Sequence, residues 1–178
     1  MKRSLTLTPS ISRVSSPLGD LLLACTSMGV CGLWFKHQAH FPLNARLWTP
    51  AGPHHPDRLL HDRVQSWVDD YFAKRPPSTP LPLDWSAWGT AFEHQVWRAL
   101  LDIPWGQKVS YGELARQIAR PLAARAVGSA VGKNPWALVV PCHRVGGSNG
   151  SLTGYAAGVD KKTYLWTLEA HPQAEPHA

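Results

Sequence analysis

Prolines at positions 76, 77, 80 and 82 fall within the segment KRPPSTPLP, residues 74–82, and this cluster strongly constrains the fold. Proline fixes its φ angle and lacks a backbone N–H, so neither a helix nor a central strand can continue through the cluster. The segment is therefore predicted to be a linker. We expect an N-terminal α/β domain over residues 1–88, a second domain over residues 89–170 and a flexible tail over residues 171–178.

The N-terminal part is predicted to be a small sheet covered by one helix. Residues 20–26 and 30–35 have strand character, and the turn between them makes a hairpin, with an earlier turn at residues 16–19. Residues 40–56 are rich in Pro and His and are expected to form a loop. Residues 57–72 are predicted to form an amphipathic helix. Its apolar side chains at helical spacing are Leu60, Val64, Trp67, Val68 and Tyr71.

The second part is predicted to be mostly helical, which makes the fold class α+β. Thr90 and Glu93 form a capping-box pattern that opens a helix ending near Leu101. Ser110 and Glu113 form another such pattern.

The helix that starts at Ser110 has to stop before Pro121, and residues 122–131 predict a further helix directly after it. Two short helices joined by a tight turn form a helix-turn-helix, here winged-helix-like. From the pattern alone this is either a DNA-binding motif or an ordinary helical hairpin. The second helix has small side chains at nearly every position and could approach another helix or a DNA groove closely, with Arg125 as its long side chain.

The last segment surrounds a single cysteine. Residues 136–140 are predicted to be a buried strand that delivers Pro141 and Cys142. A loop follows over residues 146–158, with Tyr155 as its aromatic residue, and the final helix is expected over residues 160–169.

Composition narrows the class of protein. With 178 residues, 44% of them hydrophobic, the chain can build a core without disulfides or metal. Lysine and arginine outnumber aspartate and glutamate by 18 to 12, so a polyanionic partner is compatible with the charge of +6. No apolar run approaches the roughly 20 residues that span a membrane, and the first residues do not form a signal peptide. Three cysteines without a Cys-x-x-Cys pair argue against a disulfide framework, so we expect a cytoplasmic protein in which Cys25 and Cys31 are inert.

Cys142 precedes a histidine, which raises the question of nucleophilic chemistry. A thiol near pKa 8.5 is mostly protonated at neutral pH, so a nucleophilic Cys142 needs a base. His143 has a suitable pKa, but neighbouring side chains on extended chain point apart. A bridging water, or a turn directly after Pro141, would solve this. Glu169 could orient the imidazole if the final helix folds back. From the residues alone, an inert buried thiol beside an exposed histidine remains the alternative.

Several motifs together resemble one family. Pro141-Cys142-His143-Arg144-Val145, preceded by Arg125-Ala126-Val127-Gly128 and Asn134-Pro135, is similar to the signature of the O6-alkylguanine-DNA alkyltransferases, also called methylated-DNA–protein-cysteine methyltransferases. The resemblance covers residues 14–169 and is dense from Phe92 onward. Further matching residues are Ser16-Pro17-Leu18-Gly19, Gln95-Val96-Trp97, Ile103-Pro104, Gly106, Ser110-Tyr111, Gly154-Tyr155, Lys162 and Glu169.

The resemblance implies direct DNA repair. An alkyl group would move irreversibly from O6-alkylguanine in duplex DNA to the protein's own cysteine, with O4-alkylthymine as a further candidate substrate. The protein would act once and need no cofactor. The partner would be double-stranded DNA carrying the lesion, without membrane or obligate protein partner, and the protein would be a monomer. The cysteine and histidine positions do not match the structural zinc site of some members, so no metal is expected.

The resemblance also assigns roles to residues. Cys142 would accept the alkyl group, His143 would deprotonate it through a water, and Glu169 would orient His143. Asn134 would brace the turn that holds the cysteine, and Tyr111 would donate to the departing guanine. The residues implied in DNA binding are Arg125, Ala126, Gly128, Ala130 and Ser110. Arg125 would fill the gap left by the flipped nucleotide, while the small residues let the helix lie in the minor groove.

The residues implied at the substrate pocket are Tyr155, Val145, Trp136 and Ala156. Ala156 and Ala157, and Trp136 with Ala137, depart from common family patterns and bear on the size of the alkyl group. Two other classes compete with this interpretation. Lesion-sensing relatives have another residue in place of the cysteine, whereas Cys142 is present here. A cysteine hydrolase would need an oxyanion hole that the motif does not indicate.

Overall fold

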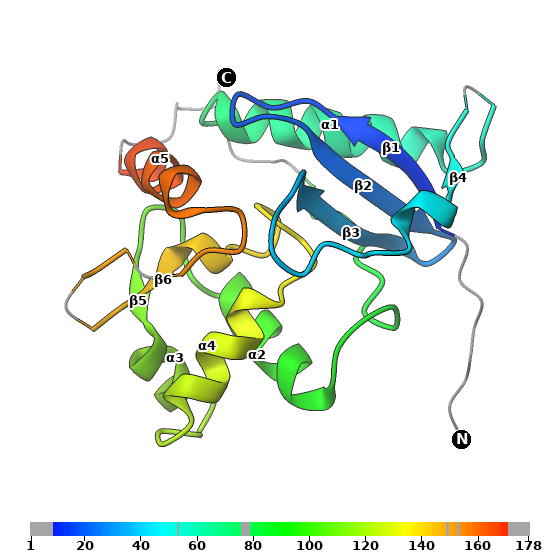
Figure 1. The fold of residues 1–178 in the computed structure, drawn as a ribbon. Helices are drawn as coiled ribbons and strands as arrows, with labels where there is room; N and C mark the ends of the chain where they lie inside the picture. Colours follow the sequence, from blue (N-terminus) through cyan, green and yellow to red (C-terminus); the bar gives the residue numbers. More distant parts are fainter. Residues whose placement is uncertain (1–8, 53, 76–78, 149, 153, 171–178) are drawn as a thin grey trace.

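The computed structural model, which describes residues 9–52, 54–75, 79–148, 150–152 and 154–170, begins with a four-stranded sheet (Figure 1). The strands lie in the order β3-β2-β1-β4. Their bounds are β1 Ser10–Val14, β2 Leu21–Thr26, β3 Gly29–Phe35 and β4 Thr49–Pro50. β2 runs antiparallel to both β1 and β3, and β4 runs parallel to β1. The predicted hairpin is confirmed as β2 and β3.

Strands β1 and β4 do not follow from the sequence pattern. β4 is two residues long and contains Pro50, which is tolerated because β4 lies at the edge of the sheet. It pairs with β1 because the Ala51 N–H donates to the Ile11 carbonyl at 2.7 Å. The segment predicted as a loop, residues 40–56, therefore contains an edge strand and a short 3-10 turn, Ala45–Leu47.

One helix, α1 (Arg58–Phe72), covers the sheet as predicted, and Figure 1 shows it lying along the strands. Its buried face includes Val64, Val68 and Tyr71, which belong to the main hydrophobic core. Residues 76–78 of the predicted linker and the predicted tail, residues 171–178, lie outside the described residues. The helix-breaking effect of the prolines is consistent with the end of α1 at Phe72.

The rest of the chain is mostly helical, so the predicted α+β class is confirmed. Helices α2 (Ala91–Leu101) and α3 (Tyr111–Gln117) both open with the predicted capping boxes, at Thr90 and Ser110. α3 and α4 (Ala124–Gly132) form the predicted pair of short helices, and α5 (Val159–Glu169) ends the described chain. A two-stranded parallel sheet joins β5 (Val109–Ser110) to β6 (Val145–Gly146).

The predicted strand over residues 136–140 is wrong. Trp136 makes one isolated bridge to Leu33, and the chain then turns, with Leu138 at a positive φ of 68°. The Val140 N–H donates to the Trp136 carbonyl at 2.9 Å and so closes the turn. The apolar run correctly indicates that this segment is buried. The prediction of a strand is wrong because burial alone does not distinguish a strand from an irregular core segment.

Trp136 joins the sheet to the helical part of the chain. Its indole Nε1 donates to the Val30 carbonyl at 2.8 Å, and its ring packs against Trp85 and Trp97 with centroids 4.8 and 5.6 Å apart. The Leu33 N–H donates to the Pro135 carbonyl at 2.8 Å. One buried apolar cluster therefore runs from the sheet into the helices, and the domain boundary at residue 88 stays a prediction. Within the described part of the chain, no helix has the length and apolarity needed to cross a bilayer.

Candidate active site

Cys142 is the first residue of a 3-10 turn, Cys142–Arg144, that follows Pro141 directly. The sequence left two ways to bring Cys142 and His143 to one site, a bridging water or a turn directly after Pro141, and the structure contains the turn. The thiol is buried, with 6% of the residue exposed, and burial raises its pKa. A hydrogen bond from Asn134 and the positive charge of Lys162 act in the opposite direction.

Asn134 holds the segment that carries the cysteine. Its Nδ2 donates to the Val140 carbonyl at 2.7 Å and to Cys142 Sγ at 3.0 Å. Its Oδ1 accepts from the Trp136 N–H at 3.0 Å. Because this segment is an irregular turn, its backbone groups lack sheet partners, and the side-chain amide satisfies them.

His143, the next residue of the turn, is fully buried. Its Nε2 is 2.8 Å from Glu169 Oε1, because the end of α5 folds back onto the turn. An ionised carboxylate only accepts hydrogen bonds, so Nε2 carries the proton and Nδ1 keeps the lone pair of the neutral ring. Nδ1 has no hydrogen-bond partner among the described residues. Burial lowers the pKa of His143, although Glu169 acts to raise it.

Glu169 is held as an anion by several donors. Arg144 donates to both carboxylate oxygens, from Nε to Oε2 at 2.9 Å and from Nη2 to Oε1 at 3.0 Å. The Gly106 N–H donates to Oε2 at 3.3 Å, and the Tyr71 hydroxyl donates to Oε1 at 2.6 Å. Burial acts to raise the pKa of Glu169, but the hydrogen bonds from His143 and Arg144 outweigh it and leave the pKa far below its usual range.

Lys162, on α5, is buried beneath the site. Its Nζ donates to the Val145 carbonyl at 2.6 Å and to the Gly154 carbonyl at 3.3 Å, which ties β6 to the loop before α5. Burial lowers the pKa of Lys162 to about 8. The ammonium therefore holds the loop and adds a positive charge near the thiol.

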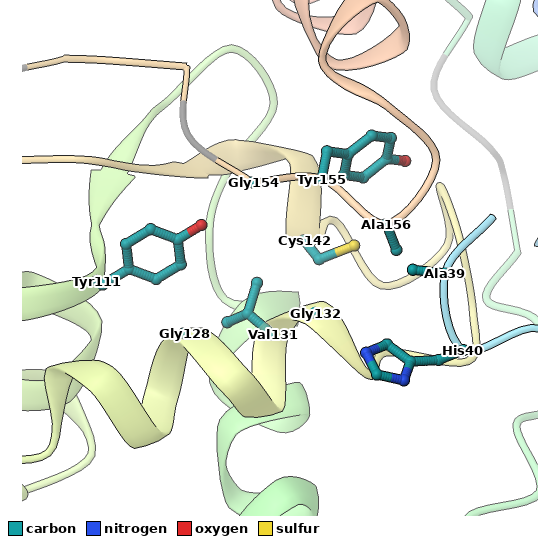
Figure 2. Close-up of a pocket in the computed structure, with 10 residues that line it drawn as sticks. All are labelled: Ala39, His40, Tyr111, Gly128, Val131, Gly132, Cys142, Gly154, Tyr155 and Ala156. Carbon is teal, nitrogen blue, oxygen red and sulfur yellow. The ribbon is translucent and has the colours of Figure 1, made fainter.

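A cavity of about 240 Å³ opens above Cys142. Figure 2 shows the cysteine between Tyr111 on one side and Ala39 and Ala156 on the other. The cavity is lined by Ala39, His40, Tyr111, Gly128, Val131, Gly132, Cys142, Gly154, Tyr155 and Ala156. Gly128 adds no side chain to the part of the cavity wall that faces the Tyr111 ring. The site thus combines a thiol, a neutral imidazole with a free lone pair and a phenol.

The second half of the chain matches the family model described as "6-O-methylguanine DNA methyltransferase, DNA binding domain" over residues 91–171. A methylated-DNA–protein-cysteine methyltransferase of Mycobacterium tuberculosis is 42% identical, with 88% of this chain and 89% of that protein covered. One from Salmonella typhimurium is 55% identical, covering 89% and 94%. The chain belongs to the methylated-DNA–protein-cysteine methyltransferase family.

Solved structures agree with this assignment. A crystal structure of a Mycobacterium tuberculosis OGT variant superposes with a TM-score of 0.81, at 38% identity, covering 94% of this chain and 96% of that one. The Mycobacterium tuberculosis OGT in complex with DNA superposes with a TM-score of 0.76, at 40% identity, covering 90% and 92%. The family predicted from the motifs is therefore confirmed. The predicted enzyme class, methyltransferase, is confirmed as well.

In this methyltransferase the structure brings together most of the predicted catalytic residues. Asn134 is hydrogen-bonded to Cys142 and Glu169 to His143, and the two pairs meet because Cys142 and His143 are consecutive residues of one turn. Tyr111 lines the cavity over the thiol. Tyr155 and Ala156 also line the cavity as predicted. Val145 and Trp136 do not: both are fully buried, Val145 in β6 and Trp136 in the core beneath the sheet. Both apolar side chains pack in the core.

The residues predicted to bind DNA are divided between two environments. Arg125 and Ala126 are exposed on α4, and half-buried Gly128 faces the cavity. Ala130 is only 2% exposed and lies on the core side, where its carbonyl accepts from Trp97 Nε1 at 2.8 Å, so it offers no surface to DNA. The Ser110 hydroxyl accepts from the Glu113 N–H at 3.1 Å and so caps α3.

Sequence reasoning missed the contributions of the first half of the chain. Ala39 and His40, from the segment after β3, line the cavity, and Tyr71 contacts the Glu169 carboxylate. Arg144 belongs to the recognised motif but received no role. The one signal in the sequence is Tyr71 on the apolar face of α1, a position that predicts packing.

Proposed function

We propose that the protein repairs DNA directly, by moving an alkyl group from O6 of guanine in duplex DNA to Sγ of its own Cys142. The observation that carries this proposal is the thiol of Cys142 in the wall of the cavity, on the same turn as a buried imidazole whose Nδ1 has no hydrogen-bond partner in the described part of the chain. A thiol beside a base is the arrangement that nucleophilic transfer requires.

The first step is proton transfer. The Cys142 proton passes through a water to Nδ1 of His143, and the imidazolium that forms is stabilised by Glu169 2.8 Å from Nε2. Burial raises the pKa of Cys142, so the resting form is the thiol and the step needs a base. The hydrogen bond from Asn134 to Sγ then stabilises the developing thiolate.

The second step forms the S–C bond and breaks the bond between the alkyl carbon and O6. The thiolate supplies the electron pair, and the guanine leaves with the pair of the broken C–O bond. Tyr111, which lines the cavity, donates a hydrogen bond or proton to the departing base. A thioether is not reversed by any group of the cavity, so each molecule acts once and no cofactor is needed.

Access to the thiol requires base flipping. A guanine stacked in a duplex cannot reach Cys142, since the thiol lies in the wall of a cavity. We assign α4 to the minor groove, where Ala126 and Gly128 permit close approach and Arg125 occupies the place of the extruded nucleotide. We assign the cavity of about 240 Å³ to the O6-alkylguanine base, with O4-alkylthymine as a second substrate to test.

Intact-protein and peptide mass spectrometry tests the proposal. The protein is mixed with duplex DNA containing one O6-methylguanine, in parallel with Cys142→Ser and, as a matched control, Cys31→Ser. We expect the mass of one methylene group on the Cys142 peptide, stopping at one equivalent, in the wild type and in Cys31→Ser only. Tight binding of the lesion without modification would make the protein a lesion sensor instead.

We further propose that the protein works as a monomer in the cytoplasm. All three cysteines are free and buried, which fits a reducing compartment, and one chain holds the thiol, the base and the carboxylate. Light scattering of the purified protein, with and without DNA, tests the monomer.

A further inference from the structure

We propose that Tyr71, on helix α1 of the first half of the chain, is a positioning residue for alkyl transfer that fixes the protonation of the His143–Glu169 pair. The inference rests on the proposed function, in which His143 is the base. It also gives the sheet-and-helix half of the protein a part in the chemistry.

The hydroxyl of Tyr71 contacts both partners of the pair. It donates to Glu169 Oε1 at 2.6 Å and lies 3.2 Å from His143 Nε2. Since Nε2 is itself 2.8 Å from the same Oε1, the phenol, carboxylate and imidazole form a closed triangle. These contacts span 72 and 98 residues of sequence, so they exist only because α1 packs against the turn and the end of α5.

Packing fixes the ring that carries this hydroxyl. Tyr71 is 2% exposed, and its ring stacks on Trp67 with centroids 5.6 Å apart. Phe72 and Trp105 make edge contacts at 5.3 and 5.0 Å. A side chain enclosed on several sides has little freedom to turn its hydroxyl away from Glu169.

The charges around the hydroxyl keep it a neutral donor. Burial raises the pKa of Tyr71 well above its usual value, and the adjacent negative charge of Glu169 raises it further, while Arg144 acts in the opposite direction. The groups that face the triangle are Glu169 and Lys162 from α5, His143 and Arg144 from the turn, and Tyr155 from the loop before α5. The single proton of the phenol is given to Oε1, so its oxygen lone pairs are free to face the Nε2 proton of His143.

This arrangement determines which nitrogen of His143 acts as the base. Glu169 Oε1 and the Tyr71 oxygen both face Nε2 as acceptors, at 2.8 and 3.2 Å, so the proton of the neutral ring stays on Nε2. Nδ1 therefore keeps the lone pair that accepts the thiol proton. A less basic carboxylate also stabilises the imidazolium less, which helps to keep His143 neutral before substrate binds.

The test compares Tyr71→Phe with the wild type in single-turnover alkyl transfer across a range of pH. The matched control is Tyr164→Phe, which removes the hydroxyl of an exposed tyrosine on α5. Phenylalanine keeps the ring contacts of Tyr71. We expect transfer about tenfold slower near neutral pH, because without the Tyr71 hydroxyl a smaller fraction of His143 is the neutral base with its proton held on Nε2. We also expect the acid limb of the rate profile to move to higher pH, because the freed Glu169 charge raises the pKa of His143.

A purely structural role predicts a different result. Loss of packing alone would lower the rate equally at every pH, and an unmoved acid limb would overturn the inference. If Tyr71 acts through Glu169, the double variant Tyr71→Phe/Glu169→Gln should be little slower than Glu169→Gln alone. Additive losses of rate in the double variant would contradict the inference. If the wild type itself transfers no alkyl group, the proposed function fails; if it does and Tyr71→Phe matches it, only the role of Tyr71 fails.

NMR of the unmodified protein gives a second measurement that needs no variant. The hydroxyl proton of Tyr71 should exchange slowly with water and show a cross-peak to the Nε2 proton of His143. A rapidly exchanging hydroxyl, or a proton on Nδ1 at neutral pH, would contradict the proposed geometry even if Tyr71→Phe failed to fold.

Discussion

The Ala39 N–H donates to the Ala156 carbonyl at 2.8 Å, which ties the segment after β3 to the loop that lines the cavity. This bond places the next residue, His40, at the edge of the cavity across from Tyr111 (Figure 2). His40 adopts a positive φ of 59°, an uncommon backbone conformation for a residue other than glycine. The first half of the chain therefore helps to set the width of the opening.

His40→Ala should change the preference between small and bulky adducts. Removal of the imidazole widens the opening, so the rate with O6-benzylguanine relative to O6-methylguanine should rise, by roughly tenfold if one ring-sized contact is relieved. Single-turnover rates with the two lesions give this ratio. His37→Ala is the matched control, since His37 is on the same segment but does not line the cavity. An unchanged ratio would mean that the opening is set elsewhere.

Asn134→Ala should destabilise the protein by about 3 kcal/mol, because buried backbone groups of Trp136 and Val140 lose their partner. It should also raise the pKa of Cys142, since the hydrogen bond from Asn134 lowers it. Chemical denaturation measures the first effect and the pH dependence of thiol alkylation the second. Asn44→Ala, at an exposed position, serves as control. Equal stability of the two variants would refute the bracing role.

The stability of the protein should fall as the pH is lowered from about 7 towards 4, the range around the unfolded values of His and Glu. The pKa values of His143 and Glu169 are both depressed in the folded state. The unfolded chain therefore binds more protons in this range, and each group contributes stability above its unfolded pKa that is lost on acidification. Denaturation at a series of pH values checks this. In Glu169→Gln the free energy of unfolding should fall less steeply with decreasing pH below pH 5. An equally steep fall would mean that other groups cause the loss of stability.

Arg125→Ala should reduce repair more than it reduces DNA binding. If Arg125 occupies the place of the flipped nucleotide, its loss impairs base extrusion, whereas a simple phosphate contact would weaken binding and repair together. Binding to lesion-free duplex and single-turnover transfer at saturating protein separate the two. Arg13→Ala, on the sheet, controls for loss of one positive charge. If binding and repair fell by the same factor, Arg125 would be a phosphate contact and would not occupy the place of the flipped nucleotide.

Trp136→Ala should destabilise the protein by about 4 kcal/mol, the usual effect of removing a fully buried tryptophan. Because its indole links Val30 of the sheet to Trp85 and Trp97, we expect the sheet and the helices to unfold in one transition in the wild type. Far-UV circular dichroism and tryptophan fluorescence should give coincident curves. Two separated transitions in the wild type would show that the halves are independent.

The sequence by itself determined the local features of this protein. Thr90 and Ser110 mark the starts of α2 and α3, because a capping box satisfies backbone donors within one turn of chain. The hairpin, the amphipathic helix α1 and the motif around Cys142 likewise depend on neighbouring residues. These features need no knowledge of distant parts of the chain.

The tertiary structure decided what depends on contacts between distant segments. The apolar run after Pro135 became an irregular turn, because Asn134 and Leu33 satisfy backbone groups that a strand would pair along a ladder. Ala130 faces the core, because Trp97 packs on that side of α4. Tyr71 entered the site only through its contact with Glu169, 98 residues away. Local propensity carries no information about such pairs, since their energy arises only when the whole chain has packed.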